Sequence, residues 1–129
     1  MKKQSIVIEP QRLEASAIPG VNHRTLASAA TGLSQLSVWR QTMAPGAATP
    51  PHAHDCDEVV LCLGGWGEVH SEGRVERFGV DSTLVLPAGR EHQIFNVGAQ
   101  PLETIGLFAA TPVVTRALDG SPLALPWSS

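Results

Sequence analysis

The sequence predicts an all-β protein, organised as a sandwich or barrel of about eight to ten short strands. Its 129 residues include 12 glycines and 10 prolines, which interrupt the chain every several residues. Between these breaks, apolar and β-branched residues form short runs, and no amphipathic 3.6-residue pattern persists beyond a turn or two. Short strands joined by glycine- and proline-containing turns are the pattern expected of such folds.

The expected strands follow these breaks in order. An edge strand is expected at Ser5–Glu9, and the stretch Gln11–Asn22 is loop-like. The remaining strands are expected at His23–Ala30, Ser34–Met43, Glu58–Leu63, Trp66–Ser71, Arg74–Phe78, Thr83–Leu86, Gln93–Val97 and Leu102–Ala109. The tail Thr111–Ser129 places leucines and Trp127 between prolines and a glycine, so we expect it to cover the barrel or a partner subunit.

The length, net charge and cysteine content of the chain predict its domain organisation and exclude some classes of partner. A chain of 129 residues is expected to form one domain, with a barrel core at about 33–109, an N-terminal arm at 1–32 and a C-terminal tail at 110–129. The net charge of -3 argues against nucleic acid as a partner. The apolar run near the N-terminus is too short for a signal peptide or a membrane span. With only 2 cysteines, the chain is expected in a reducing cytoplasm.

One stretch, Pro50-Pro51-His52-Ala53-His54-Asp55-Cys56-Asp57-Glu58, combines residues that ligate metals. His52 and His54 are two residues apart, so their side chains project to the same side of an extended strand. The acidic tripeptide after them is turn-like, and Glu58 then begins an apolar strand. Because a carboxylate at the head of a buried strand needs a cation, we expect half of a metal site here.

This stretch and a later one resemble the two motifs of the cupin superfamily. The first motif is matched by Gly46, His52, His54, Glu58 and Gly65. The second motif is matched by Pro87, Gly89, His92 and Asn96, with Asp81 in the place of its leading glycine. The resemblance covers the segment from Gly46 to Asn96. It implies a jelly-roll-like β-barrel with a single domain, like the small bacterial-type cupins, that binds one metal ion.

The resemblance also implies which residues hold the metal, namely His52, His54, Glu58 and His92. Three imidazoles and one carboxylate suit a single divalent transition metal ion (Fe, Mn, Ni, Co, Cu or Zn) and leave open positions on an ion that prefers six ligands. The other two histidines, His23 and His70, have no ligand-like context and are expected at the surface. Cys56 is expected to be a turn residue, and Asn96 a structural one.

In cupins, the strand before the first motif and the last strand supply the cavity walls. The resemblance therefore implies a pocket lined by Trp39, Gln41, Met43, Thr104, Gly106 and Phe108. Cys62 joins them by parity, because it lies four residues beyond Glu58 on the same strand. The opposite phase, with Val38-Arg40-Thr42 and Glu103-Ile105-Leu107 facing inward, stays open. The first phase makes the pocket apolar, which favours a small aromatic or dicarbonyl-like substrate that chelates the metal and argues against a sugar phosphate.

Three functions fit such a site. We prefer a metal-dependent oxygenase, an oxidoreductase of the dioxygenase type, because the expected pocket is poor in general bases. Some cupin lyases use a tyrosine as the base, and this chain has 0 tyrosines. The alternatives are a non-redox metal-dependent isomerase, lyase or decarboxylase and a non-catalytic cupin that binds a small ligand.

The resemblance further implies a homodimer. Val59, Leu61 and Leu63 lie on the face of their strand opposite Glu58 and Cys62, so both faces of that strand are apolar. One of these faces needs covering by another sheet, by the tail or by a second subunit.

Overall fold

The computed structural model describes residues 4–129, which form eleven strands and two short 3-10 helices. The helices are η1 (Pro10–Arg12) and η2 (Ala29–Thr31). The first six strands are β1 (Ala15–Ile18), β2 (Val21–Ala27), β3 (Ser37–Met43), β4 (Ala53–His54), β5 (Glu58–Gly64) and β6 (Trp66–Ser71). The last five are β7 (Arg74–Gly79), β8 (Thr83–Leu86), β9 (Gln93–Asn96), β10 (Leu102–Phe108) and β11 (Thr115–Arg116). The all-β prediction is confirmed.

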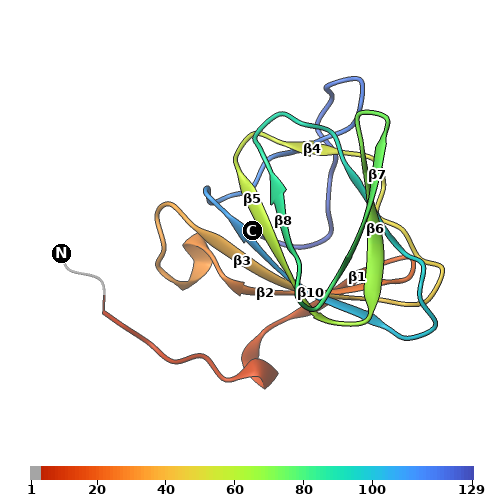
Figure 1. Ribbon diagram of the computed structural model, residues 1–129. Helices are drawn as coiled ribbons and strands as arrows, with labels where there is room; N and C mark the ends of the chain where they lie inside the picture. The colour runs from red at the N-terminus through yellow and green to blue at the C-terminus, as the bar shows by residue number, and fades with distance from the viewer. Residues whose placement is uncertain (1–3) are drawn as a thin grey trace.

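The strands form a jelly-roll-like barrel of antiparallel sheets. In residues 4–129 the larger sheet has six strands in the order β1-β2-β3-β10-β5-β8, and the smaller sheet has three in the order β7-β6-β9. Figure 1 shows these two sheets facing each other across a common interior. The short strands β4 and β11 pair with each other, which ties the C-terminal tail to the segment that carries His54.

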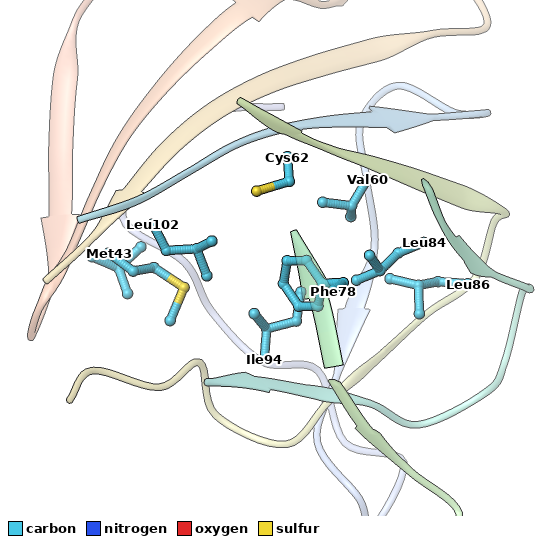
Figure 2. Close-up of a cluster of buried hydrophobic side chains, with 9 residues drawn as sticks. Met43, Val60, Cys62, Phe78, Leu84, Leu86, Ile94 and Leu102 are labelled. Atoms are coloured by element: carbon cyan, nitrogen blue, oxygen red, sulfur yellow. The ribbon is translucent and has the colours of Figure 1, made fainter. Parts of the chain in front are cut away.

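The core of the barrel lies between the two sheets. It contains Val21, Met43, Val60, Cys62, Phe78, Leu84, Leu86, Ile94 and Leu102. Figure 2 shows these side chains converging from opposite walls, with the ring of Phe78 near the centre. Removing an aliphatic or aromatic side chain of this size from water contributes about 1.5–3 kcal/mol. This cluster therefore fixes the barrel around which the candidate site is built.

Burial alternates along β3 and β10, which decides which residues face the interior. In β10, every second residue from Leu102 to Phe108 is buried. In β3, Ser37, Trp39 and Met43 are buried, whereas Arg40 is exposed. The inward phase is thus the one that contains Trp39, Gln41 and Met43 and, on β10, Thr104, Gly106 and Phe108.

The N-terminal third differs from the sequence prediction in two places. Ser5–Glu9 does not form the expected strand, because no strand within residues 4–129 pairs with it, and Val7 is 90% exposed. The stretch expected as a loop up to Asn22 instead contains β1 and the start of β2, which form a hairpin around Pro19 and Gly20. Gly20 has a φ of 74°, a conformation that glycine adopts without strain. Part of the segment expected as an arm is therefore built into the larger sheet.

The tail runs past β4 and stays against its own barrel (Figure 1). Its last residues are held by the Ser129 hydroxyl, which accepts a hydrogen bond from the Val113 amide at 2.9 Å. The Thr25 hydroxyl on β2 also donates to the Ser128 carbonyl at 2.6 Å. Within residues 4–129, the structure contains no helix with the length and apolar character needed to cross a membrane.

Candidate metal centre

Three histidines from two separate segments meet at one end of the barrel. His54 lies in β4, His52 precedes it, and His92 lies directly before β9. The backbones of His52 and His92 are joined by two hydrogen bonds, in which each amide donates to the other carbonyl at 3.0 and 2.8 Å. The structure brings these three predicted residues together, with ligand atoms that all lie within 4.8 Å of one another.

Glu58 completes the cluster from the first position of β5. Its Oε1 atom lies 3.5 Å from Nε2 of His54 and 3.5 Å from Nε2 of His92. Glu58, His54 and His92 are buried, whereas His52 is half-buried. The carboxyl group thus points at the same space as the imidazole nitrogens.

Backbone carbonyls orient two of the imidazoles. Nδ1 of His52 lies 2.6 Å from the Pro50 carbonyl, and Nδ1 of His92 lies 3.3 Å from the Arg90 carbonyl. A carbonyl oxygen only accepts hydrogen bonds, so each Nδ1 carries the hydrogen and each Nε2 keeps its lone pair. This is the arrangement in which metal-binding histidines are usually held.

Burial makes all four groups neutral near pH 7 in the absence of a cation. Desolvation raises the pKa of Glu58 to about 8. Desolvation, followed by the charges of neighbouring histidines, lowers the pKa of His54 to about 3 and that of His92 to about 4. Among the described residues, Oε1 of Glu58 is also a buried oxygen without a hydrogen-bond partner. A cation would satisfy this oxygen and the converging nitrogen lone pairs together.

The donor set fits a divalent transition metal. Imidazole nitrogen and carboxylate oxygen bind such ions at about 2.0–2.2 Å, so ligands of one ion lie no more than about 4.4 Å apart. The ligand atoms of the three histidines lie within 4.8 Å of one another, so small side-chain movements would bring them to the distances that one ion requires. Four protein ligands leave positions open on an ion that prefers six. His52, His54, Glu58 and His92 could therefore hold one metal ion and leave room for a ligand beside it.

A small cavity of about 50 Å³ opens next to these four residues. Its walls are mainly apolar and come from β1, β2, β3, β9 and the tail. Besides the four metal-site residues, it is lined by Ile18, Val21, Trp39, Gln41, Thr49, Pro50, Ile94, Thr115, Leu123, Leu125 and Trp127. The structure thus places Trp39 and Gln41, two of the pocket residues expected from the sequence, beside the metal site.

The other five expected pocket residues face the interior but do not line this cavity in the described structure; they are Met43, Cys62, Thr104, Gly106 and Phe108. Met43 and Cys62 belong to the hydrophobic core, where the Cys62 thiol donates to the Gly64 carbonyl at 3.4 Å. Thr104 is buried, and Phe108 packs against Trp39 with ring centroids 4.2 Å apart. Alternation along a strand gives the face of a residue but not its depth in the barrel, and depth separates these residues from the cavity.

His23 is a correction to the sequence prediction, which placed it at the surface. It is only 2% exposed, and its ring stacks on Trp127 at a centroid distance of 3.8 Å. Its Nδ1 atom lies 3.0 Å from Nε2 of Gln41, the residue opposite it on β3. Because β2 pairs with β3 in this register, His23 shares the inward face of Gln41. The alternation of Val21, His23 and Thr25 was the available signal, but the expected strand started two residues late.

The tail contributes cavity residues that the motif did not predict. Leu123, Leu125 and Trp127 form one wall, and Thr115 lies beside His54. Alternating apolar residues in Leu123-Ala124-Leu125-Pro126-Trp127 are a weak strand-like signal for one covered face. The sequence predicted that the tail would cover the barrel or a partner, and the structure shows that it covers its own barrel.

Sequence comparison finds relatives among plant proteins. A family model described as "Auxin binding protein" matches residues 2–119. Auxin-binding protein 1 of Arabidopsis thaliana is 34% identical over 105 residues, covering 74% of this chain and 53% of the relative. Auxin-binding protein T92 of Nicotiana tabacum is 35% identical over 112 residues, covering 78% of this chain and 60% of the relative. The chain thus spans between about half and three-fifths of the length of these relatives.

Solved structures with low sequence identity share the fold. One of these structures is a protein from Silicibacter pomeroyi, described as a sugar phosphate isomerase from a cupin superfamily. It superposes on this chain with a TM-score of 0.72 at 22% sequence identity. The match covers 96% of this chain and 100% of that protein. It confirms the jelly-roll-like barrel, and at this identity it concerns the fold alone.

Proposed function

The chain belongs to the auxin-binding protein family of the cupin superfamily, and on this premise we propose that it binds a small aromatic carboxylic acid at a divalent metal ion. The ion would be held by His52, His54, Glu58 and His92. One observation carries the proposal. Apart from these four residues, no ionisable side chain lines the cavity among the described residues.

The composition of the cavity wall supports this choice of ligand. A bound divalent cation supplies the positive charge that a carboxylate needs, and the remaining wall is apolar and aromatic. The indole N–H groups of Trp39 and Trp127 are buried and have no hydrogen-bond partner among residues 4–129. They offer donors to a ligand oxygen. Auxin is the ligand in the names of the relatives, which makes it the first acid to test.

This cavity is smaller than an aromatic acid requires. Pockets for small organic ligands have volumes of roughly 300–1,000 Å³, whereas this cavity has about 50 Å³. Leu123, Leu125 and Trp127 form the wall contributed by the C-terminal tail, and unlike the walls from β1, β2, β3 and β9 it belongs to neither sheet of the barrel. Ligand binding is therefore expected to move this part of the tail outward.

Calorimetric titration of the metal-loaded protein with indole-3-acetic acid tests the proposal. The acid is expected to bind the zinc-loaded protein, and its neutral amide at least about tenfold more weakly, because the amide lacks the charge that pairs with the cation. Protein stripped of metal is expected to bind neither compound. Equal affinity for the acid and the amide, or binding that does not need metal, would contradict the proposal.

A metal-dependent oxygenase is the second candidate function. The lack of further ionisable side chains in the described cavity lining favours an oxygenase over a non-redox metalloenzyme. Isomerases, lyases and decarboxylases need a group that moves a proton, and the described cavity offers none outside the four metal-site residues. Oxidation at a redox metal needs no such side chain, and the ligand set leaves positions open. Oxygen uptake by the iron-loaded protein with aromatic or dicarbonyl substrates would support turnover. Ligand binding without oxygen uptake would support only the binding function and not the oxygenase.

A further inference from the structure

We propose that Thr115, on β11 in the C-terminal tail, is a positioning residue for the metal centre and acts through His54. Its hydroxyl lies 3.1 Å from Nδ1 of His54, and both residues are buried, with exposed fractions of 5% and 4%. This inference rests on the metal site proposed above. It adds that the tail determines which nitrogen of His54 is available to the ion.

The pairing of β11 with β4 creates this contact. Thr115 lies directly opposite His54 in the register of the two strands. The neighbouring Val114 carbonyl accepts a hydrogen bond from the Asp55 amide at 3.3 Å, which adds a backbone contact beside this pair. The tail therefore presents the Thr115 hydroxyl to Nδ1 of this imidazole.

The Thr115 hydroxyl supports the tautomer of His54 that metal binding requires. When Nδ1 of His54 carries the hydrogen, the Thr115 hydroxyl at 3.1 Å is its acceptor. Nε2 then keeps its lone pair, and it is the atom that faces Glu58 at 3.5 Å. Without the tail, His54 is free to place the hydrogen on Nε2, where it would block the metal position.

His54 differs in this respect from the other two histidines. Nδ1 of His52 and Nδ1 of His92 are held by carbonyls two residues earlier in the chain, so local backbone fixes them. The partner of His54 is 61 residues away in sequence. Only this imidazole depends on how the tail is docked.

An ion pair beside this contact fastens the same two strands. The Arg116 guanidinium donates from Nε and Nη2 to the two carboxylate oxygens of Asp55 at 2.8 and 2.9 Å. Planar two-point pairs of this kind fix orientation as well as distance. Asp55 follows His54 directly and Arg116 follows Thr115 directly, so the pair holds Thr115 in register. Metal binding and docking of β11 are therefore coupled, and the coupling is reciprocal.

Chelator competition with Zn²⁺ on Thr115→Val and Thr115→Ser tests the role of the hydroxyl. Valine keeps the shape and removes the oxygen, whereas serine keeps the oxygen. Loss of such a partner of a metal ligand weakens metal affinity by about 10–100-fold, and we expect this for Thr115→Val, with Thr115→Ser close to wild type. Thr104→Val removes the hydroxyl of a buried threonine outside the cavity lining and serves as the matched control.

A second readout follows the tautomer and the tail in the folded protein. Long-range ¹⁵N–¹H spectra of the histidines are expected to show one neutral tautomer of His54 in wild type, with the hydrogen on Nδ1. In Thr115→Val they are expected to show a mixture of the Nδ1–H and Nε2–H tautomers. Hydrogen exchange of wild-type residues 113–116 is expected to slow on addition of Zn²⁺, which also tests the coupling if Thr115→Val fails to fold.

Three results would overturn the inference. They are wild-type affinity in Thr115→Val, an equal loss in Thr115→Ser, and exchange in residues 113–116 that does not respond to metal. If wild type itself binds no Zn²⁺, the proposed metal site fails first and this inference fails with it.

Discussion

Glu58 is the residue whose chemistry depends most on a cation. Its side chain is buried, no cationic side chain lies within salt-bridge distance of it in residues 4–129, and desolvation raises its pKa to about 8. His54 and His92 beside it are neutral near pH 7, because burial lowers the pKa of His54 to about 3 and that of His92 to about 4. Metal binding below pH 8 must therefore displace one proton, from the carboxyl group.

This gives a pH prediction for metal affinity. Between about pH 5.5 and 8 the apparent affinity should rise about tenfold per pH unit, because one proton leaves for each ion bound, and it should level off above the pKa of Glu58. Chelator competition over this range measures the slope. Glu58→Gln, which cannot release the proton, should bind more weakly with a flat profile. A wild-type profile without slope, or the same slope in Glu58→Gln, would contradict the assignment.

The sequence predicted the cluster of His52, His54, Glu58 and His92 because its members lie in two short motifs whose spacing reflects strand geometry. Thr115 and His23 could not be assigned in this way. Thr115 reaches His54 across 61 residues, and no local pattern encodes a contact of that range. His23 is recognisable as inward-facing only when its register against β3 is known.

At the scale of elements, β10 determines how much room Glu58 has. Gly106 pairs with Val60 on β5 and lies diagonally from Glu58, which pairs with Phe108. A Cβ atom at Gly106 would lie 3.2 Å from Oε2 of Glu58 and 3.1 Å from the ring of Phe108. The absence of a side chain at this position lets the carboxyl group sit against the strand. The phase in which Gly106 faces inward was one of the two that the sequence left open.

Gly106→Ala is expected to crowd both neighbours. Phe108 is 1% exposed and cannot move freely, so the new methyl group should displace the carboxyl group of Glu58. We expect a stability loss of about 1–3 kcal/mol in urea unfolding, the usual cost of overpacking, together with weaker Zn²⁺ binding. Gly79→Ala is the control, because its nearest neighbours are 3.8 Å away. Unchanged metal affinity in Gly106→Ala would show that Glu58 is not confined by β10.

Strands with clear breaks on both sides were predicted most accurately. Trp66–Ser71 and Thr83–Leu86 have the bounds expected from the sequence, since glycine or proline flanks each of them. The strand β1 was missed because Ala15-Ser16-Ala17-Ile18 has little apolar contrast and gains its order from pairing with β2. Ser5–Glu9 shows the converse, because β-branched residues alone do not form a strand without a partner.

At the scale of the whole molecule, the outer face of the larger sheet is unusually apolar. Leu61, Leu63 and Val85 on β5 and β8 are 39%, 46% and 70% exposed. The tail packs against inward-facing residues such as His23 and Trp39, so it leaves these three side chains open. Arg40 and Glu103, 3.7 Å apart on neighbouring strands, lie on the same outer face and offer charges of both signs to a symmetric partner. We propose that a second copy of the chain packs on this face.

The homodimer proposal predicts a mass of two chains in light scattering at micromolar concentration. Replacing both Leu61 and Val85 with lysine should give a monomer, because two charges would be buried at the interface. Val75→Lys, at a residue 56% exposed on the smaller sheet, should leave the dimer intact. A wild-type protein that is monomeric at this concentration would contradict the proposal.

The central claim is that His52, His54, Glu58 and His92 hold one metal ion, and elemental analysis tests it most directly. Wild-type protein, purified and then equilibrated with Zn²⁺ and desalted, should retain about one ion per chain. The His52→Ala and His92→Ala variants should retain almost none, while His70→Ala, altered at a half-exposed histidine on β6, should match wild type. Retention of the ion in His52→Ala and His92→Ala, or its absence from wild type, would contradict the claim.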